Sequence, residues 1–129
     1  MTNPLNFNYK FFQDVFIVNQ GLSGSQYCEC SFNNMLCTDI ALFKAHFFNC
    51  IFENCILAES NLTSVEFENC VFKNTIFEAI SLDNSLFCES ELLEVTFRNV
   101  QLNSDYPVRI RRNRKIFLAS DMDDFETKI

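Results

Sequence analysis

The sequence from Leu42 to Phe72 reads LFKAHFFNCIFENCILAESNLTSVEFENCVF, and every fifth residue of this stretch is leucine or phenylalanine. The spacing extends from Leu22 to Leu102, where each fifth position is apolar or aromatic, and backward to Phe7. An α-helix would smear such a stripe around its surface, and a strand would send alternate members to opposite faces. The pattern therefore predicts a chain that turns a corner every five residues.

A second spacing, of 20 residues, indicates how many corners complete one turn. Phe32 and Phe52 are 20 residues apart, as are Leu42 and Leu62. Four sides of five residues would stack such like side chains at the strand spacing of about 4.8 Å. Small or medium residues two positions before each large one would help fill a narrow core. The predicted core residues are Leu42, Phe47, Phe52, Leu57, Leu62, Phe67, Phe72, Phe77, Leu82 and Phe87.

These residues resemble the motif of the pentapeptide-repeat family, which is a small residue, a polar residue, Leu or Phe, and two polar residues. Residues 60–64 (SNLTS) fit it, and residues 52–55 and 67–70 (both FENC) fit its Phe-x-Asn-Cys variant. The resemblance implies an all-β fold, a right-handed quadrilateral β-helix or solenoid of tandem pentapeptide repeats. We expect about four to five coils and a non-repeat C-terminal tail.

The repeat divides the chain into three predicted segments. Residues 1–20 form a first coil or an N-terminal cap, residues 20–104 form the β-helix, and residues 105–129 form a C-terminal cap or tail. The repeat stops because Pro107 occupies the position of the next large residue. Each open end of a β-helix needs a cap, since coils of neighbouring chains would otherwise add to it.

The tail contains a basic run, residues 108–118, that reads VRIRRNRKIFL. One interpretation is a cap, with Val108, Ile110, Ile116 and Phe117 covering the last coil while the arginines pair with nearby acids. A second is a contact with a partner protein or a second copy. A third, nucleic acid or anionic lipid, is disfavoured by the acidic body of the rod. The candidate interaction residues in this run are Arg109, Arg111, Arg112 and Arg114.

Outward positions are mostly polar, with one exception. Leu36, Ile56 and Ile76 share one outward column with 20-residue spacing, and Ile51 and Val71 lie on the preceding side. An apolar stripe on a surface indicates an interaction site unless the chain itself covers it. Two alternatives follow, namely cover by a terminal segment of the same chain, or a dimer or partner surface.

Composition limits the class of protein. The 129 residues include 16 Phe but only two Gly and two Pro, which are few turn-forming residues for a β-sandwich. The net charge of -7 repels nucleic acid and anionic membranes, so no direct nucleic-acid binding is expected. The sequence has no apolar run of about 18 residues and no signal-peptide pattern, which predicts a cytoplasmic protein without a membrane span. Seven cysteines without a secretory signal favour reduced thiols.

No catalytic constellation is apparent in the sequence. His46 is the single histidine, at an outward position, and no Ser or Cys has a partner at a spacing typical of a nucleophile and its base. Alternation would place Cys28 outside and Cys30 inside, which argues against a zinc pair. We therefore predict that the protein is not an enzyme and has no catalytic, cofactor-binding or metal-binding residues.

The leading hypothesis is a rigid, non-catalytic interaction or scaffold module, whose partner is another protein or a second copy. The family resemblance implies two alternatives. One is a DNA-mimicking binder of a type II topoisomerase such as gyrase, as in quinolone-resistance members, and the other is an effector or receptor-like module that binds a host protein. Residues 21–104 hold eleven acids and three basic residues, a net charge of -8. A DNA stretch of the expected rod length, about 20 Å, carries about 12 charges, so the mimicry is incomplete.

Overall fold

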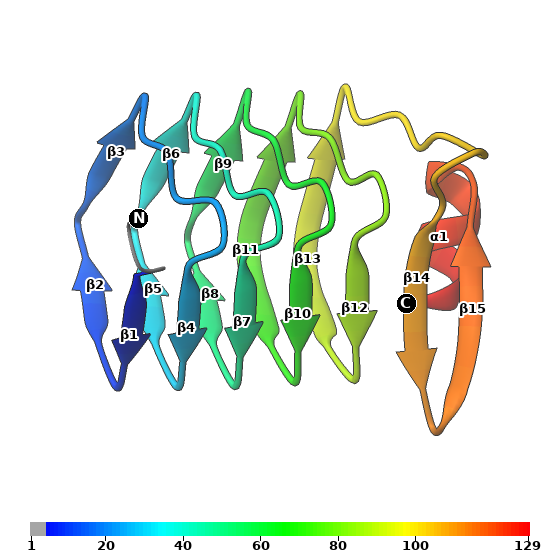
Figure 1. The fold of residues 1–129 in the computed structure, drawn as a ribbon, viewed down its shortest axis with the longest axis horizontal. Coiled ribbons are helices and arrows are strands. Elements are labelled where there is room, and N and C mark those ends of the chain that lie inside the picture. Colours follow the sequence, from blue (N-terminus) through cyan, green and yellow to red (C-terminus); the bar gives the residue numbers. More distant parts are fainter. Residues whose placement is uncertain (1–4) are drawn as a thin grey trace.

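The computed structural model describes residues 5–129 and shows a four-sided β-solenoid of about five coils (Figure 1). This confirms the predicted fold class. Phe67 pairs in parallel with Phe47 on one side and with Phe87 on the other, so neighbours in the sheet are 20 residues apart. The predicted length of one coil is therefore correct.

The four sides carry short strands in a repeating order. On the first side, isolated bridges join Gly21, Ala41, Asn61 and Ser81. The second side holds β1 (Asn6–Asn8), β4 (Gln26–Cys28), β7 (His46–Phe48), β10 (Glu66–Glu68) and β12 (Leu86–Cys88). The third holds β2 (Phe11–Gln13), β5 (Ser31–Asn33) and β8 (Ile51–Glu53), and the fourth holds β3 (Phe16–Val18), β6 (Leu36–Thr38) and β9 (Ile56–Ala58). Two longer strands, β11 (Val71–Glu78) and β13 (Glu91–Arg98), run along both the third and fourth sides.

The corners are made by single residues in the left-handed backbone region. From Tyr9 to Asn99, every fifth residue has a φ between 46° and 75°, and only one of these residues, Gly24, is glycine. Asparagine is the commonest occupant, because it tolerates this conformation better than most L-residues do. The backbone amide of the corner residue Asn54 donates to the Lys73 backbone carbonyl at 3.0 Å, and the side-chain amide of Asn74 donates to the side-chain Oδ1 atom of Asn54 at 2.7 Å. These bonds join successive coils at the corner.

We expect replacement of the corner residue Ala79 by glycine to increase the stability of the protein. Ala79 is exposed and has a φ of 51°, which is strained for a residue with a Cβ. Ala79→Gly should raise the free energy of unfolding by about 0.5–1 kcal/mol, since relief of strain exceeds the added chain entropy. Ala58→Gly, inside β9, should lower it by a similar amount. Urea unfolding followed by circular dichroism gives both values, and equal destabilisation by the two variants would contradict this explanation of the corners.

The core is a set of stacked rings. All ten predicted core residues are buried, each at most 3% exposed. Phe52 stacks between Phe32 and Phe72, with ring centroids 4.7 Å apart on both sides and nearly parallel planes. Phe67 belongs to the neighbouring stack and meets Phe72 edge-on at 5.1 Å. Stacked contacts along the rod and edge contacts across it are both favourable aromatic geometries.

Small inward-facing side chains, two positions before the large ones, also form hydrogen bonds between coils. The Cys70 thiol donates to the Phe47 carbonyl at 3.4 Å, and the Ser90 hydroxyl donates to the Phe67 carbonyl at 3.2 Å, in each case 23 residues earlier in the chain. A small side chain with a donor therefore connects one coil to the previous one. All seven cysteines are free thiols. Burial raises the pKa of the Cys37 thiol to about 12, which keeps it protonated and unreactive at neutral pH.

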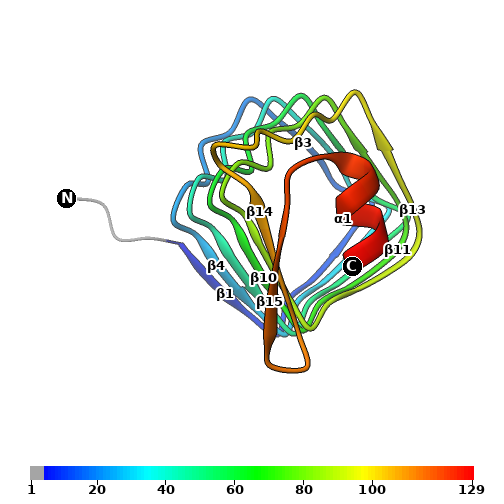
Figure 2. The same cartoon turned by 90° about the vertical axis from the view of Figure 1, so that its right-hand side faces the viewer.

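The C-terminal segment closes one end of the solenoid. Strand β14 (Val108–Arg112) continues the second side beside β12, and β15 (Lys115–Ala119) folds back antiparallel on β14. Helix α1 (Met122–Lys128) then lies across the end of the last coil (Figure 2). Its Phe125 is fully buried, with its ring edge-on to Phe87 at 5.1 Å and to Phe97 at 5.4 Å. Phe125 thus terminates two aromatic columns.

This cap differs in part from the one predicted. Val108 and Ile110 are buried as expected, but Ile116 is 66% exposed and Phe117 is 36% exposed. The prediction for these two residues was wrong because β15 lies beyond the last coil, where α1 rather than the strand fills the end of the core. The predicted pairing of the arginines with acids is also absent from residues 5–129, where no arginine forms an ion pair within 4.0 Å.

The N-terminal end has no comparable cover among the described residues. Strands β1 to β3 continue the repeat, and their inward residues Phe7, Phe12 and Ile17 are only partly buried. An apolar cavity of about 240 Å³ opens between these side chains and those of the next coils. Within residues 5–129 the two ends of the rod are therefore chemically different, since one is closed by a helix and the other presents open strand edges.

Candidate functional site

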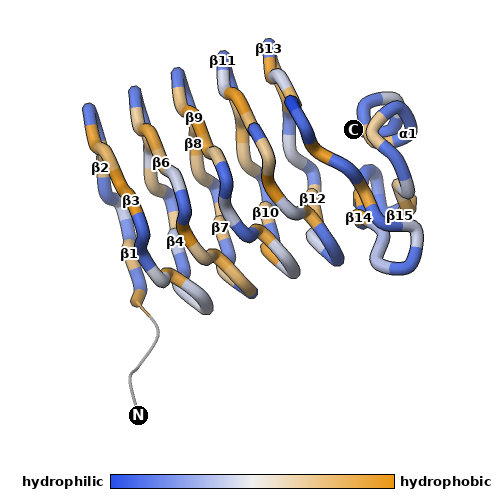
Figure 3. The backbone as a smooth tube through the Cα atoms, turned by 90° about the horizontal axis from the view of Figure 1, so that it is seen from above, coloured by the Kyte–Doolittle hydropathy of each residue, from blue (hydrophilic) through white to orange (hydrophobic). Residues whose placement is uncertain are grey.

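The predicted apolar stripe is present on the outer surface of the third and fourth sides. Leu36 and Ile56 are each 37% exposed and Ile51 is 43% exposed, whereas Val71 and Ile76 are half-buried. The register places Leu36, Ile56 and Ile76 side by side on β6, β9 and β11, and Ile51 beside Val71 on β8 and β11. Apolar segments recur at corresponding places in successive coils, as the orange parts of the tube show (Figure 3).

The stripe extends into the first coil, and the residues that extend it were not among those predicted. Phe16 pairs with Leu36 and is 62% exposed, and Phe11 lies one strand further back at 63% exposed. We name the whole set the outer apolar columns, which comprise Phe11, Phe16, Leu36, Ile51, Ile56, Val71 and Ile76. The signal was available, since both phenylalanines follow the 20-residue spacing.

One alternative for the stripe was cover by a terminal segment of the same chain. The C-terminal hairpin extends the second side, and α1 lies across the end of the last coil rather than on the outer face of the strands that carry the outer apolar columns (Figures 1 and 2). Residues 105–129 therefore leave the columns exposed.

The arginines of the basic run have separate roles. Arg112 is half-buried and donates to the carbonyl oxygens of Ser90 (3.0 Å) and Ile129, which ties the last coil to the chain end. Arg109 is exposed and donates to the Asn84 carbonyl at 3.2 Å. Arg111 and Arg114 are exposed as well. Arg112 is thus a structural residue of the cap, and the other three are available to solvent.

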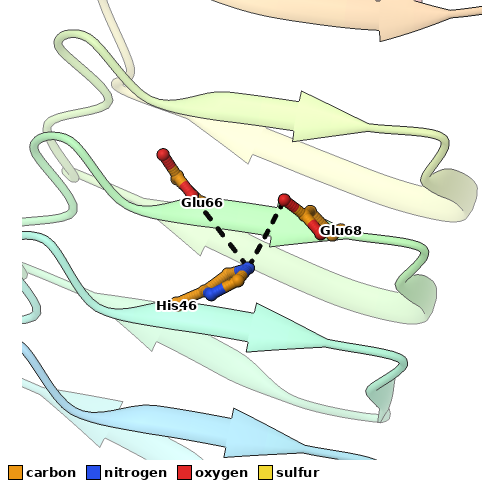
Figure 4. A group of neighbouring side chains, drawn as sticks. All are labelled: His46, Glu66 and Glu68. Carbon is orange, nitrogen blue, oxygen red and sulfur yellow. Dashed lines mark ion pairs between the residues drawn. The ribbon is translucent and has the colours of Figure 1, made fainter.

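A polar cluster lies on the outer face of the second side (Figure 4). His46 on β7 pairs in register with Glu66 on β10, and Glu68 lies two residues further along β10, so all three side chains share one face. The His46 Nε2 atom lies 3.6 Å from a Glu68 carboxylate oxygen and 4.0 Å from a Glu66 oxygen. The sequence predicted an outward position for His46 but not this group, which the 20-residue register brings together.

The first side carries a shallow groove of about 1290 Å³ that runs along the rod. Its lining combines small and amide side chains with the carboxylates of Asp39, Glu59 and Asp83. The groove is polar and open, and the described residues around it include no histidine, cysteine or basic side chain.

His46 has no nucleophile to activate in this arrangement. The groups that face its imidazole are two carboxylates, and within residues 5–129 no Ser or Cys side chain is hydrogen-bonded to it.

No helix within residues 5–129 has the length and apolar composition needed to cross a membrane.

Comparisons with known proteins agree with the repeat. The family model described as pentapeptide repeats matches residues 42–78, in 8 copies. No curated protein matches the chain. A pentapeptide repeat protein from the thylakoid lumen of Arabidopsis thaliana has a similar structure, with a TM-score of 0.71 and 17% identity over 81% of this chain and 72% of that one.

Two further solved structures are less similar. A plasmid-mediated fluoroquinolone resistance protein has a TM-score of 0.39 and 12% identity, covering 78% of this chain and 73% of its own. A pentapeptide repeat protein from the cyanobacterium Cyanothece has a TM-score of 0.31 and 13% identity, with 74% and 89% covered. At these identities the similarity to the Arabidopsis protein shows a shared fold.

Proposed function

We propose that this chain, whose residues 42–78 match the pentapeptide-repeat family, acts as a rigid, non-catalytic module that binds another protein through its outer apolar columns. The inward positions of the repeat are explained by packing, because they are needed to fill the core. The outer columns are not needed for that purpose. Their apolar character on the surface therefore calls for a functional explanation.

The observation that carries this proposal is the exposure of large apolar side chains on successive, firmly paired strands. Leu36, Ile51 and Ile56 are between 37% and 43% exposed, on strands held in register by hydrogen bonds to both neighbouring coils. A surface that is already ordered loses little conformational entropy when a partner binds. Apolar anchors at the centre of an interface often contribute most of its binding energy.

Paired substitutions test this surface. The double variant Leu36→Gln/Ile56→Gln removes two apolar contacts, and Glu53→Gln/Lys73→Gln is the matched control, since both of its positions are exposed and its net charge is unchanged. Each immobilised protein is used to capture partners from extracts of the source cells, with quantitative mass spectrometry. We expect a partner that wild type and control retain and the double variant loses by at least about tenfold, equivalent to 1.4 kcal/mol.

Sedimentation velocity of the same three proteins identifies the case in which the partner is a second copy. If wild type and control sediment as dimers and the double variant sediments as a monomer, the outer apolar columns form the dimer interface. Equal retention of every captured protein by the double variant, together with an unchanged sedimentation coefficient, would contradict the proposal. Thermal unfolding verifies that all three proteins are folded.

A further inference from the structure

We propose that His46, Glu66 and Glu68 form a surface binding site for a divalent transition-metal ion of the Zn²⁺ type. The three side chains come from two adjacent strands, β7 and β10, and project from the same outer face (Figure 4). Each offers one ligand atom, and the three atoms lie within 4.8 Å of one another. The site is separate from the outer apolar columns, which lie on other sides of the rod.

The separations are close to those of a metal site. Zinc binds imidazole nitrogen and carboxylate oxygen at about 2.0–2.2 Å, so tetrahedral ligands stand about 3.3–3.6 Å apart. The His46 Nε2 atom is already 3.6 Å from Glu68 and 4.0 Å from Glu66. The two glutamate side chains are 42% and 35% exposed, and this freedom allows their carboxylates to close on an ion without any movement of the strands.

The His46 imidazole forms no hydrogen bond at the atom that faces the glutamates. The side chain is 33% exposed, but its Nε2 atom is itself buried and has no hydrogen-bond partner within residues 5–129, with carboxylate oxygens at 3.6 and 4.0 Å. A buried nitrogen without a partner is costly, because it has lost its contact with water. Glu66 and Glu68 are also like charges on one face of one strand. A single divalent cation among the three groups gives the nitrogen a partner and neutralises the repulsion.

The donor set indicates the class of metal. One imidazole and two carboxylates suit Zn²⁺ and neighbouring transition metals, whereas Ca²⁺ and Mg²⁺ prefer sites built from oxygen alone. Three protein ligands leave one tetrahedral position open to water or to a donor from a bound protein. The hydrogen-bonded register between β7 and β10 fixes the backbone positions of all three ligands before the metal binds.

The single histidine makes a direct test feasible, because the imidazole NMR signals of the chain all belong to His46. Untagged, metal-free, full-length protein is titrated with ZnCl₂ while these signals are followed, and calorimetry on the same samples gives the stoichiometry. We expect a saturable shift with one Zn²⁺ per chain. Glu66→Gln and Glu68→Gln should each weaken binding by at least about tenfold, as loss of groups around metal sites does.

Two control variants separate this site from other zinc-binding groups. Glu53→Gln removes an exposed glutamate from the neighbouring side and should leave the affinity unchanged. Cys28→Ser/Cys88→Ser removes the two half-buried thiols, and the His46 shift should persist in this variant. The proposal is overturned if the imidazole signals do not respond to Zn²⁺, if Glu68→Gln binds as tightly as wild type, or if binding disappears with the two thiols.

Discussion

Phe72→Ala is expected to lower the free energy of unfolding by about 3–5 kcal/mol, the usual cost of truncating a fully buried phenylalanine. The Phe72 ring is fully buried, stacks on Phe52 and meets Phe67 edge-on. Its removal leaves a cavity that the short, rigidly paired strands cannot close. A loss of this size is a large part of the stability of a typical domain, which is about 5–15 kcal/mol.

Denaturant unfolding of Phe72→Ala and Phe43→Ala provides the comparison. Phe43 is 40% exposed and lies beneath the Lys44 ammonium at 5.1 Å, so its loss should cost no more than about 1 kcal/mol. If the two variants were destabilised equally, the stacked rings would not be the main source of stability that the structure indicates.

Phe125→Ala is expected to release the C-terminal cap. Phe125 is fully buried and its ring touches the last members of two aromatic columns, Phe87 and Phe97. Its loss should destabilise the cap by about 3–5 kcal/mol, because a seven-residue helix has little stability without its buried anchor. Hydrogen exchange of the β14 and β15 amides should accelerate strongly, while exchange at Phe52 and Phe67 stays slow.

An open end should then favour association between chains, since strand edges without a cap pair with other edges. Sedimentation velocity of Phe125→Ala should show larger species that wild type lacks at the same concentration. Phe117→Ala is the matched control, because that ring is 36% exposed and lies on the outer hairpin. Unchanged exchange at β14 in Phe125→Ala would contradict the role given to this residue.

The sequence predicted the coil because the packing that defines it is periodic. Each inward position meets the same neighbours as the residue 20 places away, so Phe52 and Phe72 report one environment. The corner conformation was less evident, since the left-handed positions accept asparagine, glutamate and alanine alike. There the chain geometry imposes the backbone angle, and the side chain only modifies its cost.

The need for a cap and the burial of Val108 and Ile110 were predicted, but the packing of α1 could not be predicted from the repeat, because its contacts are made once. Helix α1 did have a local signal in Asp121, whose side chain accepts from the Asp124 amide at 2.8 Å as a helix N-cap does. That signal identifies a helix but not the surface on which it packs. The position of Phe125 against Phe87 depends on where the hairpin ends, which no sequence spacing specifies.

The group formed by His46, Glu66 and Glu68 was not predicted from the sequence, for a different reason. His46 and Glu66 are 20 residues apart, so the predicted coil already places them side by side. A search for ligands at the short spacings typical of zinc motifs does not detect such a pair. In a solenoid, groups of side chains that share a face are better sought among residues one coil apart.

Photo-crosslinking from the outer apolar columns tests the central claim most directly. A photoreactive phenylalanine analogue is placed at Ile56, within the columns, and in a second protein at Asn61, an exposed polar position on the first side, which carries none of the columns. After irradiation in source cells, we expect an adduct of defined mass from position 56 and none from position 61. Equal adducts from both positions, or none from position 56, would contradict the claim that these columns bind a partner.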